Sequence, residues 1–244
     1  MSTYVLVHGS FQGGWCWERV IPHLVKAGHH VVALDLPGHG EDTTPVAQVT
    51  LDSYVATVRK VVETRQEPVI LVGHSFGGMV ISQVAEQIPE KVQKLVYLAA
   101  LLPQNGLSAL QLPNPDGDAL MANIIINQAE GWVFVKQEAI GPVYYTDCTP
   151  EDVAYVVPKL QVEPLMPYMQ PVTLSAEKFG TVKRYYIGCQ QDRSVTPAFQ
   201  QVLLAATPCE QVFTLDAGHS PYISRPAELA AILLQLAQVA QGVN

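Results

Sequence analysis

The stretch VGHSFGGMV, residues 72–80, places a serine in a setting suited to nucleophilic chemistry. Ser75 lies between Gly73 and Gly77, after the apolar run PVILVG and before the helical pattern FGGMVISQVAEQI. Strand, G-x-S-x-G and helix in this order are typical of a nucleophile elbow, a sharp turn that exposes the serine hydroxyl above a sheet. The alternative is a tight strand-to-helix turn that contains an incidental serine.

A serine hydroxyl needs an adjacent base, and His219 is the candidate that we favour among the seven histidines. It follows the last strand-like run, in DAGHSPYISRP, and so falls at the carboxyl edge of a parallel sheet, as Ser75 does. Asp192 follows the preceding strand-like run and is the predicted acid that fixes the imidazole tautomer. Asp216 is the rival for this role, and Asp35 lies in a loop that does not normally supply the acid.

Two backbone N–H groups would complete a site for acyl transfer. Phe76, directly after the serine, supplies one of them, and the loop HGSFQGGW after the first predicted strand supplies the other. Ser10 is the expected donor in that loop, through its backbone. Such donors stabilise the negative charge that develops on the carbonyl oxygen in the transition state.

The elements that must position these residues can be predicted from the apolar pattern. Six short runs are nearly continuous in apolar residues, which is typical of parallel strands that are buried on both faces: TYVLVHG, HVVALDL, PVILVGH, KLVYLAA, VKRYYIGC and EQVFTLDAG. Helical patterns alternate with them, at residues 16–28, 51–65, 76–88, 196–206 and 226–240. The chain is therefore expected to form an α/β fold with a mostly parallel central sheet of about six strands, flanked by helices.

Residues 103–178 break this alternation and are expected to form a helical cap over the carboxyl edge of the sheet. The core would then comprise residues 1–102 and 179–244. The cap contains large side chains that could roof an apolar pocket, although ordinary packing within the cap is the alternative: Trp132, Phe134, Tyr144, Tyr145, Tyr155, Met166, Tyr168 and Met169. Phe11, beside the expected oxyanion donor, and Phe76, directly after the serine, are also expected to line the pocket.

Composition excludes several other classes of function. The net charge is −8 and the basic residues are scattered, so no nucleic acid partner is expected. The apolar runs are too short to cross a bilayer, and the first residues lack the features of a secretory signal, so we expect a cytoplasmic protein. The four cysteines lie far apart and are expected to be free thiols, with a zinc site or disulfides as the alternative. No pattern of metal ligands appears, and neither a metal nor a cofactor is expected.

These residues together resemble the α/β-hydrolase superfamily over essentially the whole chain, and Ser75, Asp192 and His219 follow its order. The match is closer to the plant methylesterase and hydroxynitrile lyase group and its bacterial carboxylesterase relatives. The motifs that carry it are LVHGSFQGGWCW, VVALDLPGHG, VGHSFGGMV, FGTVKRYYIGCQQDRSVTPAFQQ and GHSPYISRPAELA. The likeness is weak in residues 103–178, where substrate choice would reside.

That group contains two chemistries, which differ at two positions. The lyases carry a threonine after the histidine that ends their first strand and a lysine after their catalytic histidine, whereas this chain has Gly9 and Ser220 there. The resemblance therefore implies ester hydrolysis, and it argues against cyanohydrin cleavage. It adds Gly9 and Ser220 to the expected pocket residues, beside Phe11, Trp132, Phe134, Tyr144 and Met166.

The resemblance implies a serine carboxylesterase that acts through an acyl-enzyme, and the few charges among the apolar residues of the cap fit small, neutral hydrophobic esters. A small-molecule ester would then be the partner of the site. Two alternatives remain open: a lyase, and a ligand-binding or receptor-like α/β-hydrolase without turnover. A homodimer is also open, because relatives are often dimers.

Overall fold

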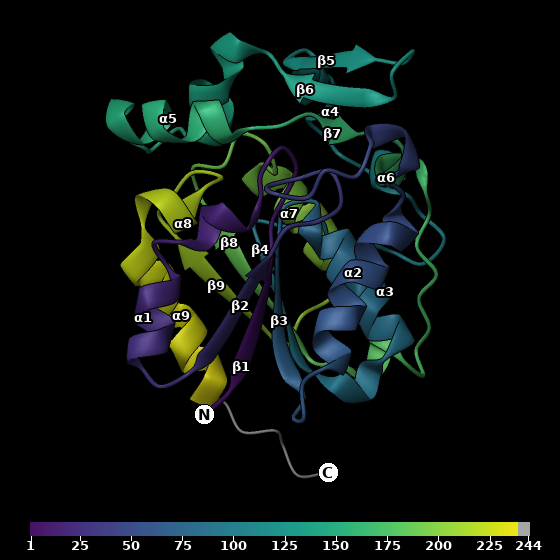
Figure 1. The fold of residues 1–244 in the computed structure, drawn as a ribbon, viewed down its shortest axis with the longest axis vertical. Helices are drawn as coiled ribbons and strands as arrows, with labels where there is room; N and C mark the ends of the chain where they lie inside the picture. The colour runs from purple at the N-terminus through teal and green to yellow at the C-terminus, as the bar shows by residue number, and fades with distance from the viewer. Residues whose placement is uncertain (239–244) are drawn as a thin grey trace.

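The computed structural model describes residues 1–238, and within this range six parallel strands form the central sheet (Figure 1). The strands match the six predicted runs: β1 (Thr3–Val7), β2 (His30–Leu34), β3 (Val69–His74), β4 (Val92–Leu98), β8 (Arg184–Cys189) and β9 (Gln211–Leu215). Their order across the sheet is β2-β1-β3-β4-β8-β9, and all neighbours pair in parallel. The expected α/β fold with a parallel sheet is confirmed.

The strands are mainly apolar, on both faces, because the sheet has a core on each face. In β1, Val5 and Val7 belong to one apolar cluster, whereas Tyr4 and Leu6 belong to the other. Successive side chains of a strand point to opposite faces, so a strand between two layers of helices is mainly apolar and does not alternate.

Helices cover both faces of the sheet. One face carries α1 (Ile21–Lys26), α8 (Pro221–Ser224) and α9 (Pro226–Gln238), and the other carries α2 (Leu51–Glu63), α3 (Gly77–Gln87) and α7 (Pro197–Ala206) (Figure 1). The helix expected at 16–28 is instead a short 3₁₀ turn, Gly14–Trp17, followed by α1, in which Pro22 occupies the first turn. Residues 239 and 240 of the last expected helix lie outside the described residues.

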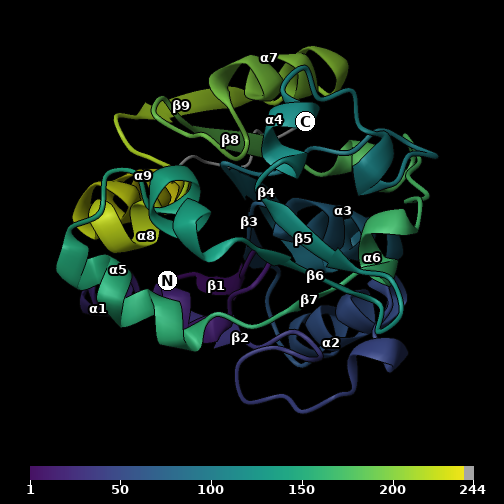
Figure 2. The same cartoon turned by 90° about the horizontal axis from the view of Figure 1, so that it is seen from above.

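Most of the segment 103–178 lies over the carboxyl ends of the strands, as Figures 1 and 2 show, whereas its last residues, including Thr173 and Ser175, run beside α3. It contains the short helices α4 (Gly117–Met121), α5 (Pro150–Val156) and α6 (Met166–Met169). It also contains a small antiparallel sheet of β5 (Ile124–Asn127), β6 (Trp132–Val135) and β7 (Glu163–Pro164), which a purely helical cap does not include. These strands have two to four residues each, too few for alternation to reveal them in the sequence.

The sequence led us to expect no membrane-spanning segment, no metal site and no disulfide, and residues 1–238 of the structure bear on each expectation. Within this range, no helix has both the length and the apolar character that a bilayer span requires. Likewise, no group of three or more potential metal-ligating side chains comes together among the described residues. All four cysteines are free thiols, which agrees with the expectation.

Candidate active site

Ser75 occupies the sharp turn between β3 and α3. Its backbone has φ +52°, a left-handed conformation that is uncommon for any residue other than glycine. A Cβ atom on Gly73 would lie 2.7 Å from the carbonyl oxygen of Gly77, and one on Gly77 would lie 2.9 Å from the carbonyl oxygen of His8. The two glycines are therefore required by the close approach of the backbone around the serine, as the elbow motif predicts.

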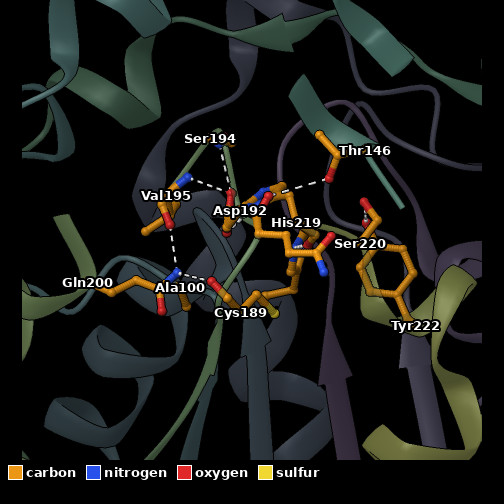
Figure 3. A network of polar contacts seen from close by, with 12 residues as sticks. Ala100, Thr146, Cys189, Asp192, Ser194, Val195, Gln200, His219, Ser220 and Tyr222 are labelled. Carbon is orange, nitrogen blue, oxygen red and sulfur yellow. Dashed lines mark hydrogen bonds and ion pairs between the residues drawn. The ribbon is translucent and has the colours of Figure 1, made fainter. Parts of the chain in front are cut away.

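Asp192 and His219 form a buried pair at the carboxyl ends of β8 and β9 (Figure 3). Nδ1 of His219 donates to Oδ2 of Asp192 at 2.7 Å, and both residues are almost fully buried. The other oxygen, Oδ1, accepts hydrogen bonds from the backbone N–H groups of Ser194 at 2.7 Å and Val195 at 2.9 Å. These two bonds fix the carboxylate, which in turn places the proton of the neutral imidazole on Nδ1 and leaves Nε2 free to accept one.

The rival acid, Asp216, does not contact the imidazole in this arrangement. Its Oδ1 accepts a hydrogen bond from Nε2 of Gln191 at 2.6 Å, on the exposed side of the loop. The structure therefore pairs His219 with Asp192, as the sequence predicted. Ser75 and His219 both line one cavity, at the edge of the sheet that the sequence indicated.

His74, the variable residue of the elbow, holds the backbone of His219 in place. Nε2 of His74 donates to the carbonyl oxygen of His219 at 2.8 Å, and the two ring centroids are 4.6 Å apart. Burial, and secondarily the charge of His219, lowers the pKa of His74 well below its usual value, so the His74 ring stays neutral.

The cavity between core and cap has a volume of about 270 Å³ and is lined mainly by apolar side chains. The predicted residues Ser10, Phe11, Phe76 and Tyr144 line it together with Ser75 and His219. Among the described residues of its wall, none is lysine, arginine, aspartate or glutamate. A desolvated charge would have no counter-charge there, so the wall favours neutral groups.

The structure places three predicted pocket residues of the cap outside the cavity wall. In β6, Val133 faces the cavity, whereas the indole of Trp132 lies on the other side of the strand and donates to Glu130. Phe134, also on that other side, packs edge-on against Phe11, with ring centroids 5.6 Å apart. The reason is the alternation of side chains along a strand, which the prediction did not include because it expected helices.

Met166 is 46% exposed at the start of α6, and its neighbour Leu165 lines the cavity instead.

Gly9 and Ser220 were also predicted to line the pocket, but neither is among the described residues that line the cavity. A Cβ atom on Gly9 would lie 2.8 Å from Cβ of Ser75, so the glycine permits close packing and does not leave open space. Ser220 is fully buried, and its hydroxyl pairs with that of Tyr222 at 2.9 Å (Figure 3). Neither position provides the cation that would stabilise a cyanide leaving group.

Sequence reasoning missed most of the apolar wall. Residues from one cap segment supply much of it: Ala109, Leu110, Leu112, Leu120, Met121, Ile124 and Ile126. Their apolar character was visible, but the segment has neither a helical nor an alternating period, so no pattern indicated which side chains face inward.

The fold and this site define a class of protein. Residues 4–232 match the family model described as the alpha/beta hydrolase family, and the chain belongs to this family.

Several of the similar proteins within this family are named as esterases or ester hydrolases. The chain is 31% identical to methylesterase 7 of Arabidopsis thaliana over 97% of this chain and 96% of the relative. Among solved structures, it is 26% identical to polyneuridine aldehyde esterase, with a TM-score of 0.89 and coverage of 98% and 100%. It is also 26% identical to a pyrethroid hydrolase from Sphingobium faniae JZ-2, with a TM-score of 0.86 and 98% coverage of both chains. The predicted resemblance is confirmed.

Proposed function

We propose that this protein is a serine carboxylesterase that hydrolyses small, neutral, apolar esters through an acyl-enzyme. One observation carries the proposal: Ser75, in a strained elbow, and His219, oriented by Asp192 at 2.7 Å, open into the same apolar cavity. The names of three similar proteins, a methylesterase, polyneuridine aldehyde esterase and a pyrethroid hydrolase, support the same class of reaction.

The mechanism follows from the roles of these groups. The hydroxyl oxygen of Ser75 attacks the ester carbonyl while Nε2 of His219 takes its proton. The N–H groups of Ser10 and Phe76 stabilise the oxyanion, and Asp192 stabilises the imidazolium. His219 then gives the proton to the departing alcohol. Water, activated by the same imidazole, hydrolyses the acyl-enzyme and releases the acid.

The cavity sets the class of substrate. Its volume of about 270 Å³ is just below the usual range for ligand pockets, roughly 300–1,000 Å³. A small ester fits this volume, and the wall offers no charged group to a carboxylate or an ammonium. We therefore infer that both parts of the ester are uncharged.

Hydrolysis of p-nitrophenyl esters of increasing acyl length by the purified protein tests the proposal. Ser75→Ala should abolish turnover, whereas Ser82→Ala should retain it. Ser82 is a matched control because it is a buried serine in α3 that bonds the carbonyl oxygen of Gly78 and the hydroxyl of Tyr97. An active Ser75→Ala variant would refute the proposal, and a wild-type protein that binds the esters without turnover would favour the receptor-like alternative.

The lyase alternative is not favoured, because the similar proteins include several esterases and because Gly9 and Ser220 replace the lyase residues. Release of cyanide from mandelonitrile would reopen it. A cytoplasmic location, a homodimer and the lack of a nucleic acid partner stay predictions. Cell fractionation, light scattering and electrophoretic mobility assays, respectively, test them.

A further inference from the structure

Glu163, in β7, is a buried carboxylate between the cap and the core. It is 1% exposed and has three partners. Its Oε2 accepts a hydrogen bond from the backbone N–H of Phe11 at 3.1 Å and lies 3.1 Å from Nε2 of His39. Its Oε1 accepts a hydrogen bond from the hydroxyl of Tyr54 at 3.0 Å. A carboxylate so deeply buried requires such partners, which makes this cluster a built feature of the fold.

His39 supplies the positive side of the cluster. Burial lowers the pKa of His39, but the negative charge of Glu163 and the contact with it outweigh this effect and raise the pKa above its usual value. The fully buried imidazole of His39 therefore keeps its proton to a higher pH than an exposed histidine does. Its positive charge compensates the negative charge of Glu163.

The contact with Phe11 matters because Phe11 belongs to the loop that presents Ser10. Phe11 has φ +68°, a left-handed conformation that its side chain disfavours. The cap takes both of its backbone polar groups: Glu163 accepts from the N–H, and the N–H of Gln161 donates to the C=O at 2.9 Å. The cap segment 161–163 therefore holds Phe11 in this conformation.

His8 fixes the other side of Ser10. Its Nε2 accepts a hydrogen bond from the backbone N–H of Leu36 at 3.0 Å, so the proton lies on Nδ1, which donates to the carbonyl oxygen of Gly9 at 2.7 Å. That carbonyl and the N–H of Ser10 belong to one planar trans peptide, in which they point in opposite directions. Holding the carbonyl thus sets the direction of the N–H that is expected to bind the oxyanion.

We propose that Glu163, a residue of the cap, is a positioning residue for the reaction. It fixes the core loop that contains Ser10, whose N–H is expected to face the developing oxyanion. The inference rests on the proposed esterase function. Through Glu163, the cap would help to stabilise the transition state, and it also contributes side chains to the cavity wall. Glu163 itself does not line the cavity, and the rings of Phe134 and Tyr144 also pack against the Phe11 side chain in the wall. The effect of Glu163 should therefore fall mainly on the chemical step and less on substrate binding.

Glu163→Gln tests this inference, with Glu86→Gln as the matched control. Glu86 is also a buried carboxylate that accepts backbone N–H bonds, from Ser175 at 2.8 Å and Phe179 at 3.2 Å, but it lies in α3 away from the cavity. The measurements are kcat, KM, the thermal midpoint, and the inhibition constant of a trifluoromethyl ketone. That ketone forms a tetrahedral adduct with Ser75 whose oxyanion occupies the same position as in the reaction.

For Glu163→Gln, we expect kcat to fall by about 10- to 100-fold, because a displacement of about 1 Å at a reacting centre costs up to about 10²-fold. The inhibition constant should rise by the same factor, with KM within about threefold of its original value. Glu86→Gln should lower the thermal midpoint only. If kcat and the inhibition constant of folded Glu163→Gln both stay within about twofold of wild type, the proposal is wrong.

A second pair of variants applies if Glu163→Gln does not fold. Tyr54→Phe removes one hydroxyl from the same carboxylate, and Tyr97→Phe removes a buried hydroxyl that instead bonds Ser82 at 2.7 Å. If Tyr54→Phe loses more kcat and more inhibitor affinity than Tyr97→Phe does, the inference is supported. If the two variants lose equally, the inference is wrong. A wild-type protein without esterase activity would instead refute the proposed function, so the two failures are distinguishable.

Discussion

Replacing Asp192 with asparagine should inactivate the protein through the tautomer of His219, with little change in the shape of the site. Asparagine keeps one side-chain oxygen and replaces the other with an NH₂ group. If its oxygen faces the N–H groups of Ser194 and Val195, both of those hydrogen bonds are kept, and the NH₂ group faces Nδ1 of His219. The imidazole must then move its proton to Nε2.

The opposite orientation would keep the histidine tautomer but is less stable. Its NH₂ group would face two buried N–H donors, at Ser194 and Val195, and each donor left without a partner costs about 1–3 kcal/mol. Two such losses exceed the cost of shifting the proton between the ring nitrogens of a neutral imidazole, so we expect the first orientation. Nε2 then carries a proton and cannot accept the one from Ser75.

The expected loss in kcat is about 10⁴-fold, which corresponds to about 5 kcal/mol in activation free energy. KM should change little, because Asp192 does not line the cavity. Steady-state hydrolysis of a p-nitrophenyl ester measures both values. Asp216→Asn is the matched control, since that carboxylate bonds Gln191 at the surface and should keep full activity. Asp192→Asn with a kcat within about tenfold of wild type, or an equal loss in Asp216→Asn, would refute the reasoning.

Three further predictions concern neighbouring features. Burial, and secondarily the charge of His39, lowers the pKa of His8 to about 3, so the unfolded chain binds a proton at pH values where the folded chain does not. The free energy of unfolding should therefore decrease as the pH falls from about 6.5 towards about 3, by up to about 1.4 kcal/mol per pH unit from this residue. Measured by urea unfolding, that free energy should depend less steeply on pH in His8→Asn than in the wild type. Gly9→Ala places a Cβ atom 2.8 Å from Cβ of Ser75 and should lower kcat/KM by about 10- to 100-fold in ester hydrolysis, and unchanged kinetics would contradict the close packing. Burial raises the pKa of the Cys148 and Cys209 thiols to about 12, so iodoacetamide near neutral pH should leave activity intact, whereas a serine-directed phosphonate should abolish it.

The cap shows where prediction from the sequence stopped. Trp132 and Phe134 were expected in the pocket because they are large and apolar, yet Val133, the smaller residue between them, faces the cavity. The choice depends on which face of β6 borders the cavity, and a strand of four residues gives no pattern strong enough to indicate it. The same limit applies to Leu110 and Ile126, whose apolar character was evident and whose direction was not.

The sequence by itself determined the sheet, the elbow and the edge at which Ser75, Asp192 and His219 meet. It did so because these features depend on local patterns: strands buried on both faces are mainly apolar, and a tight turn around a serine requires glycine where backbones approach closely. Only the tertiary structure decided that Glu163 of the cap contacts Phe11 of the core and that His8 holds the carbonyl of Gly9. The first of these contacts joins residues far apart in the chain, and both depend on the direction of single side chains, which packing between elements sets and local sequence does not.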